Sequence, residues 1–282
     1  MIAPGARSFA TMNFKIAFSD IDGTLLNAAR EPSAALVEQV GRLRARGVPF
    51  VLISSRPPRA MVWIQDLLGV GDQPLVAYNG GLVLVDGRVV HTEEIPLTIV
   101  RTTLELARGT GLSVQLFHAD EWYVADMDHY ATREAHNTRV TPTVRSLAAV
   151  AEDWRARGVG AHKIMVMGPA AELDELSAAL GRDFGERLHR YRSKDDYLEV
   201  ASGSVSKLTG VRQVLAARYP ELGPEDCLAF GDNYNDVAML AGVGTGVAVA
   251  NARPEAKAVA DYVSPHTAKE DAVARYLTGG PE

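Results

Sequence analysis

The feature that most constrains the fold is an alternation of short apolar runs with helical patterns over residues 14–78. The apolar runs have the length of buried strands, and the two segments between them repeat apolar side chains at helical spacing. Strand, helix, strand, helix, strand predicts parallel strands joined by crossovers, so we expect an α/β fold with an open, Rossmann-like parallel sheet. The strands are expected at 14–19, 48–53 and 74–78, and the helices at 32–47 and 59–69.

The middle of the chain departs from this alternation. Residues 82–90 place an Asp-Gly turn between two strand-like runs, which is typical of a β-hairpin. Residues 162–168 predict a further strand and residues 170–181 an amphipathic helix. Alternation returns with a helix at 204–219 and a strand at 226–230. We therefore expect a discontinuous core at 14–84 and 202–282, an α+β cap domain inserted at 85–201, and a loose leader at 1–13.

The composition fits a protein with a large buried core. The chain has 282 residues, of which 47% are hydrophobic, and a net charge of -6. The acidic balance argues against a nucleic-acid partner, and no apolar run reaches the roughly 20 residues of a membrane span. The single cysteine, Cys227, cannot form an internal disulfide. We expect a cytoplasmic protein without a membrane partner, whose natural start is Met1 or Met12.

Four polar motifs lie just past predicted strands or at the start of a predicted helix. Ligands bind at this carboxyl edge in open α/β sheets. Several carboxylates at one edge need a cation, and Mg²⁺ is commonly held by carboxylates, waters and substrate phosphate. A serine hydroxyl and a lysine ammonium can bind phosphate oxygens, so the set predicts a phosphoryl-transfer site. The motif residues are Asp20 and Asp22 in "DIDGT", Ser54 in "SSR", Lys207 in "SVSK", and Asp232 and Asp236 in "GDNYND".

These four motifs, in this order, resemble those of the haloacid dehalogenase (HAD) superfamily of aspartate-nucleophile phosphatases. The mid-chain insertion and the "YNGG" at 78–81 are similar to the Cof-type branch, which has a class IIB cap. The resemblance covers nearly the whole chain from residue 14. It implies a HAD-like hydrolase core and a cap that determines substrate specificity.

The resemblance also implies a role for each matching residue. Asp20 would be the nucleophile that forms an aspartyl-phosphate, and Asp22 the general acid and base. Mg²⁺ would be held by Asp20, the backbone carbonyl of Asp22 and Asp232, with Asp236 acting directly or through a water. Asn235 would contact the phosphate or steady Lys207. The phosphate- and substrate-binding set is Ser54, Lys207, Asn235, Asn79 and Gly80.

The chain departs from the family pattern at two places. The usual Thr-Gly-Arg is replaced by Ser54-Ser55-Arg56, which keeps the hydroxyl but adds a side chain where glycine is common. Ala272 stands where a glycine often follows the aspartate near the end, at a point where the last helix can begin either way. Neither change alters a charged group of the expected site.

Each motif also has a plain structural interpretation. The aspartate pair could form a turn or a cap, the serine could cap a helix, and the lysine could be solvated. Their coincidence in matching contexts favours function. The seven histidines are scattered along the chain. His129 and His136 could share a helix face, but we expect them to be surface or cap residues.

Three functions remain open at this point. The leading one is a Mg²⁺-dependent phosphatase for a small phosphorylated metabolite, such as a sugar phosphate or a cofactor phosphate. A sugar phosphomutase would use the same aspartates but return the phosphoryl group to a sugar. A non-catalytic metabolite-binding relative is least favoured, because such proteins usually lose a charged catalytic residue. The sequence identifies neither the substrate nor the oligomeric state.

Overall fold

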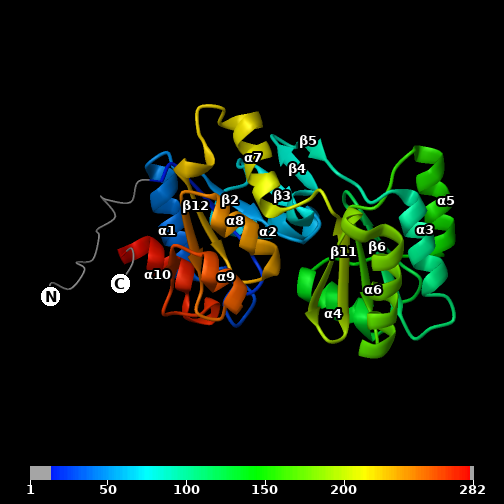
Figure 1. Cartoon of the computed structure of the whole chain (residues 1–282). Helices are drawn as coiled ribbons and strands as arrows, with labels where there is room; N and C mark the ends of the chain where they lie inside the picture. Colours follow the sequence, from blue (N-terminus) through cyan, green and yellow to red (C-terminus); the bar gives the residue numbers. More distant parts are fainter. Residues whose placement is uncertain (1–13, 280–282) are drawn as a thin grey trace. The chain divides into compact units, whose positions relative to one another are not determined.

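The computed structural model describes residues 14–279 and divides the chain into two compact units (Figure 1). Unit 1 contains the described residues up to Ser55, Met61–Val90, and those from Ser206 onward. Unit 2 contains Arg56–Ala60 and His91–Val205. The two units divide after Val90 and before Ser206, close to the boundaries expected after residue 84 and before residue 202, which stay predictions. The expected leader at 1–13 and the choice between Met1 and Met12 lie outside the described residues.

Unit 1 is built on an eight-stranded sheet in the order β14-β13-β12-β1-β2-β3-β4-β5. The pairs from β14 to β3 are parallel, and β4 runs antiparallel to β3. From β1 the chain adds β2 to β5 on one side of the sheet, and later adds β12 to β14 on the other side of β1. The strand order therefore reverses between β1 and β12. The strands are β1 (Ile16–Ser19), β2 (Phe50–Ile53), β3 (Leu75–Ala77), β4 (Leu82–Val85), β5 (Arg88–Thr92), β12 (Cys227–Gly231), β13 (Thr245–Ala248) and β14 (Tyr262–Val263).

Helices cover both faces of this sheet because alternate strand residues are apolar on both sides. Phe18 and Val51 point into a buried cluster that includes Val211 of α7. On the other face, the ring of Phe230 meets Tyr276 of α10 edge-on, with 5.4 Å between centroids. The helices are α1 (Ala34–Ala45), α2 (Arg59–Leu68), α7 (Lys207–Arg218), α8 (Val237–Gly242), α9 (Pro254–Val259) and α10 (Ala272–Gly279).

Unit 2 is a six-stranded sheet in the order β10-β11-β9-β6-β7-β8, antiparallel except for the β7–β8 pair. Alternate residues such as Leu116 and Ile164 pack against α3, α5 and α6 in one apolar cluster, around the fully buried Trp154. The strands are β6 (Ser113–His118), β7 (Glu121–Val124), β8 (Thr143–Val144), β9 (Lys163–Met167), β10 (Leu188–Lys194) and β11 (Tyr197–Ser202). The helices are α3 (Leu97–Leu106), α4 (His129–Thr138), α5 (Leu147–Arg157) and α6 (Ala170–Phe184).

The hairpin expected at 82–90 is confirmed as β4 and β5, with Asp86 and Gly87 both at positive φ in its turn. The hairpin extends the sheet of unit 1, so unit 1 continues past residue 84 to Val90. No helix in the described part of the chain is long and apolar enough to cross a membrane.

Candidate active site

The candidate site lies where the strand order of unit 1 reverses. Asp20 directly follows β1, and its backbone N–H donates to the carbonyl oxygen of Phe230 in β12 at 3.0 Å. Asp232 is two residues beyond Phe230, so the parallel register brings both aspartates to the same carboxyl edge. Carboxylate oxygens of Asp20, Asp232 and Asp236 all lie within 4.8 Å of one another. One small ion could therefore be reached by side chains more than 200 residues apart.

Lys207 joins this cluster from the first residue of α7. It is fully buried, and its ammonium donates to Oδ1 of Asp20 and to Oδ1 of Asp236 at 2.6 Å. A positive charge is unfavourable at a helix N-terminus, and a buried lysine needs ionic partners. Burial alone lowers the pKa of Lys207, but the two carboxylates outweigh burial and raise this pKa above its ordinary value. The lysine is therefore charged in the folded protein.

The carboxylates carry more negative charge than Lys207 neutralises. Burial raises the pKa of Asp20 well above its ordinary value against the pull of Lys207, and repulsion from Asp236 and Asp232 adds to the rise. Burial and then Asp236 raise the pKa of Asp232 to about 6, although Thr24 Oγ1 donates to its Oδ1 at 2.7 Å. Three carboxylates facing one ammonium form an all-oxygen donor set that suits a hard divalent cation.

Asp236 stabilises the loop that carries Asp232. Its side chain is fully buried, and its Oδ1 accepts a hydrogen bond from Lys207. Its Oδ2 accepts hydrogen bonds from the backbone N–H groups of Asp232 and Asn233, both at 2.9 Å. Both carboxylate oxygens are therefore engaged by protein donors. Of the two expected modes for Asp236, this favours action through a water over direct coordination.

Asp22 points a different way from Asp20. Its side chain is 42% exposed, and Oδ1 accepts a hydrogen bond from Arg30 Nη2 at 2.7 Å. Arg30 itself has a left-handed backbone, with φ of 59°. The ion pair draws the expected acid and base toward solvent, so catalysis by Asp22 requires its side chain to leave Arg30.

The expected phosphate and substrate residues Ser54, Asn79 and Asn235 form one hydrogen-bonded chain. Ser54 is buried just past β2, and its carbonyl oxygen accepts the N–H of Asn79 at 2.8 Å. Asn235 donates from Nδ2 to Oδ1 of Asn79 at 2.8 Å. The Lys207 ammonium bonds Asp20 and Asp236, and the Asn235 amide donates to Asn79, so both expected roles of Asn235, on the phosphate or beside Lys207, stay predictions.

Gly80 has a packing reason for being glycine. Its φ is +101°, and a Cβ there would lie 2.5 Å from the carbonyl oxygen of Ser206, the N-cap of α7. The turn at 78–80 thus presses against the start of the helix that carries Lys207. A substrate contact for the Gly80 backbone stays a prediction.

Thr24 and Asn251 also support the candidate site, although neither is part of the motif set expected from the sequence. Asn251 Nδ2 donates to the carbonyl oxygen of Gly23 at 2.8 Å, and a Cβ on Gly23 would lie 2.5 Å from Asp232 Oδ2. Asn251 lies three residues past β13, at the same carboxyl edge of the sheet. Beside these residues unit 1 has a cleft of about 600 Å³, lined among others by Asp22, Arg30 and Lys269.

Comparison with known proteins identifies the family. The profile of the haloacid dehalogenase-like hydrolases matches residues 17–277. The chain belongs to this family. A HAD subclass IIB sugar phosphatase shares the fold, with a TM-score of 0.78 at 21% identity, covering 93% of this chain and 97% of that one. The family expected from the four motifs is confirmed, and so is the α/β fold with its parallel-rich sheet.

Relatives of this HAD hydrolase match it over almost its whole length. A Haemophilus influenzae protein named as a candidate phosphatase is 32% identical over 269 residues, 94% of this chain and 98% of its own. The HMP-PP phosphatase of Escherichia coli is 28% identical over 268 residues, 94% of each chain. The crystal structure of a HAD-like hydrolase from Bacteroides thetaiotaomicron has a TM-score of 0.83 at 26% identity, covering 94% of this chain and 98% of that one.

Proposed function

We propose that this HAD hydrolase is a Mg²⁺-dependent phosphatase that acts on a small phosphorylated metabolite through an aspartyl-phosphate on Asp20. The observation that carries the proposal is the buried Asp20 carboxylate, held by Lys207 within 4.8 Å of Asp232 ligand atoms. Its relatives named as phosphatases support the reaction class. The free, buried thiol of Cys227 fits a cytoplasmic enzyme.

The residues present fit Mg²⁺. The donors are carboxylate oxygens only, two of them with raised pKa values, and one ammonium leaves their charge uncompensated. Asp20, Asp232 and the backbone carbonyl of Asp22 would hold the ion, and Asp236 would act through a water. When bound, Mg²⁺ would neutralise charge on the transferred phosphoryl group and align it with Asp20.

The chain's own residues then divide the reaction between them. Lys207 holds Asp20 by Oδ1, which leaves Oδ2 as the oxygen that attacks phosphorus. Asp22 leaves Arg30, protonates the departing oxygen, and then takes a proton from the water that hydrolyses the aspartyl-phosphate. Ser54, Lys207 and the Asn235–Asn79 pair bind the phosphoryl oxygens.

The proposed substrate is a sugar phosphate or a cofactor phosphate rather than a macromolecule. The HMP-PP phosphatase among the relatives is named for a small phosphorylated compound. The cleft beside Asp22 carries Arg30 and Lys269 on its wall, so it offers positive charge next to the attacked phosphate. A second phosphate or another anionic group of the metabolite could bind there.

A screen of phosphorylated metabolites with Mg²⁺ and with EDTA tests the proposal, using release of inorganic phosphate as the readout. We expect hydrolysis that needs the metal and is lost in Asp20→Asn. Incubation with a hexose 1-phosphate separates the phosphomutase: formation of the isomer without phosphate release would replace the proposed reaction. Binding of metabolites with no turnover of any kind would point to the non-catalytic relative instead.

A further inference from the structure

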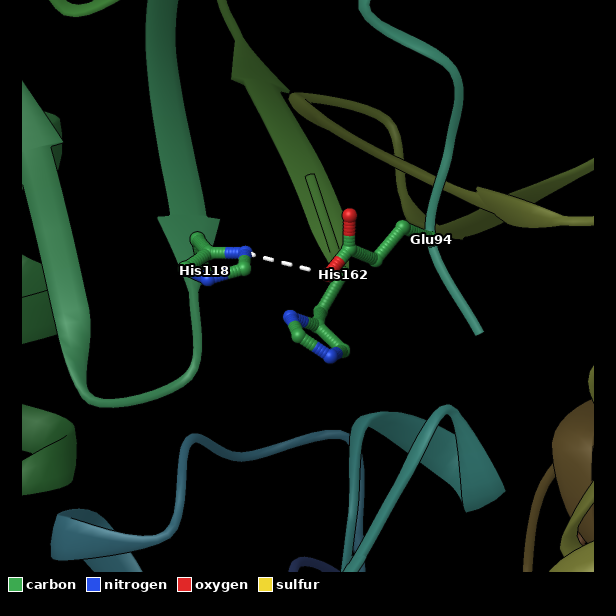
Figure 2. A group of neighbouring side chains, drawn as sticks. All are labelled: Glu94, His118 and His162. Atoms are coloured by element: carbon green, nitrogen blue, oxygen red, sulfur yellow. Dashed lines mark ion pairs between the residues drawn. The ribbon is translucent and has the colours of Figure 1, made fainter. Parts of the chain in front are cut away.

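Three side chains of unit 2 that have no part in the proposed phosphatase reaction converge on one another. Glu94 lies on the segment between β5 and α3, His118 ends β6, and His162 immediately precedes β9. Figure 2 shows His118 and the Glu94 carboxylate facing each other across an ion pair, with the His162 ring below them. One ligand atom from each lies within 4.8 Å of the others. Their positions in the sequence follow no metal-binding spacing, which is why the scattered histidines gave no such prediction.

Backbone hydrogen bonds fix the three segments relative to one another. Ile95 and Ala161 exchange two backbone hydrogen bonds, N–H to carbonyl at 2.6 Å and 3.1 Å, in an isolated antiparallel bridge. The N–H of His162 donates to the carbonyl oxygen of Phe117 at 2.8 Å. The residue next to each of Glu94, His118 and His162 is thus held by the backbone. The three side chains start from fixed points, as a preorganised binding site requires.

The atoms around His118 have the spacing of metal ligands. Its Nδ1 lies 3.0 Å from the carbonyl oxygen of Gly160 and 3.5 Å from Glu94 Oε1, while Glu94 Oε2 accepts the N–H of Gly160 at 2.6 Å. Adjacent ligands of a tetrahedral ion are roughly 3.3–3.5 Å apart when each is 2.0–2.1 Å from the metal. The observed separations bracket that value. Among the described residues no partner engages His118 Nε2, so this nitrogen can carry the proton when Nδ1 gives up its own.

His162 is held in the tautomer that a metal needs. The N–H of Ala119 can only donate, and it lies 3.1 Å from Nδ1, so this nitrogen carries a lone pair. The proton is therefore on Nε2, 3.0 Å from Thr92 Oγ1, which accepts it. A metal at Nδ1 would replace one long hydrogen bond, and Thr92 would keep the ring oriented.

Solvent reaches this cluster. A cleft of about 330 Å³ within unit 2 is lined among others by Glu94, Trp154 and Gly160. The Glu94 side chain is 24% exposed, whereas the two histidines are buried. An ion can therefore enter on the carboxylate side and meet the imidazole nitrogens behind it.

We propose that Glu94, His118 and His162 form a second metal site, for a divalent transition-metal ion such as Zn²⁺, with the Gly160 carbonyl oxygen or a water as the fourth ligand. Two imidazoles and one carboxylate suit Zn²⁺ and discriminate against Mg²⁺. The ion would tie the ends of β6 and β9 to the segment before α3. The proposal is independent of the chemistry at Asp20.

Metal titration of the tag-free, metal-stripped full chain tests the site. Excess Mg²⁺ is kept present so that the carboxylate cluster of unit 1 is filled. We expect one Zn²⁺ per chain by calorimetry, a rise in melting temperature that EDTA reverses, and the intense visible absorption of four-coordinate Co²⁺ when cobalt is substituted. Absence of saturable Zn²⁺ binding in this titration would overturn the proposal.

Variants locate the ion. Glu94→Gln and His118→Asn should each weaken Zn²⁺ binding by more than tenfold, and Thr92→Val, which only orients His162, by roughly tenfold. His136→Asn removes an exposed histidine of α4 and should leave the affinity unchanged. Asp232→Asn should keep Zn²⁺ binding while it loses the effect of Mg²⁺. Circular dichroism establishes that each variant is folded; wild-type affinity in folded Glu94→Gln and His118→Asn would refute the site.

Discussion

Lys207 Nζ lies 2.6 Å from Asp236 Oδ1, and both side chains are fully buried. The same ammonium also bonds Asp20, so one cation links β1, α7 and the loop after β12. Such a pair is weak evidence for stability as a whole, but removing one partner leaves the other charges buried without compensation. The candidate site therefore depends on Lys207 for its folding.

Lys207→Met should lower the free energy of unfolding by about 3–5 kcal/mol in the presence of EDTA. Mg²⁺ should recover part of the loss, because it supplies positive charge to the same carboxylates. Urea unfolding with and without metal measures both effects. The matched control is Lys15→Met, which removes an exposed ion pair with Asp226 and should cost less than about 1 kcal/mol. Equal losses in the two variants would contradict the buried network.

Stability of the metal-free enzyme should fall as pH rises. The pKa of Asp232 is raised to about 6 in the folded state from the ordinary value of 3.8, so the folded protein binds the proton more tightly than the unfolded chain. The Asp232 carboxyl group contributes its whole stabilisation at pH values below its pKa in the unfolded chain. This contribution, about 3 kcal/mol at most, is lost as the pH rises to the pKa of Asp232 in the folded protein. Thermal melts in EDTA from about pH 4 to about pH 7 measure the slope.

Mg²⁺ should flatten this dependence, because it binds the ionised carboxylates and so stabilises the enzyme more at the higher pH. Asp232→Asn is the control. Because an amide cannot titrate, the slope of melting temperature against pH should be smaller in this variant. A melting temperature that rises with pH over this range in EDTA would contradict the raised pKa of Asp232.

Gly23→Ala should weaken Mg²⁺ binding by roughly 10–100-fold, because the new Cβ would lie 2.5 Å from Asp232 Oδ2 and displace a ligand. Gly47→Ala is a matched control: Gly47 also has a positive φ, of +73°, but its Cβ would meet nothing within 4 Å. We expect Gly47→Ala to cost about 1 kcal/mol of stability and leave metal affinity unchanged. Calorimetric titration measures the Mg²⁺ affinity of both variants. Equal affinities would contradict the assignment of Asp232 as a ligand of the ion.

Cys227 should resist alkylation in the native enzyme. Its thiol is 1% exposed, and burial, with Asp226 and Glu225, raises its pKa to about 12. Since the thiolate is the reactive form, iodoacetamide at neutral pH should label Cys227 only when the protein unfolds. Mass spectrometry of native and urea-unfolded samples measures this. Rapid labelling of the folded protein would show that the strand β12 is not packed as described.

The candidate site could be predicted from the sequence because its residues follow short apolar runs, which are typical of buried strands. Asp20 and Asp232 are each preceded by such a run, and parallel strands bring their ends together. The orientation of Asp22 could not be predicted, because it depends on Arg30, a loop residue with a left-handed backbone. The partnership of Thr24 with Asp232 spans 208 residues and has no local signal.

The helices of unit 2 were harder to predict than its strands. Residues 97–106, "LTIVRTTLEL", are rich in β-branched side chains that favour strands, yet packing in the α3–α5–α6 layer makes them helical. Residues 129–138 have few apolar side chains, and α4 is begun by its N-cap Asp128, which accepts the N–H of Ala131 at 2.7 Å. Tertiary packing therefore makes α3 helical, and the N-cap Asp128 fixes the start of α4.

Trapping the covalent intermediate tests the proposed function most directly. Enzyme turning over a substrate with Mg²⁺ is quenched in acid, reduced with borohydride and digested, because an acyl-phosphate is reduced to the alcohol whereas a free carboxylate is not. We expect homoserine at position 20, in the peptide that carries "DIDGT", and none in Asp20→Asn. Efficient phosphate release with Asp20 unmodified under the same quench, or modification at another carboxylate, would contradict Asp20 as the nucleophile.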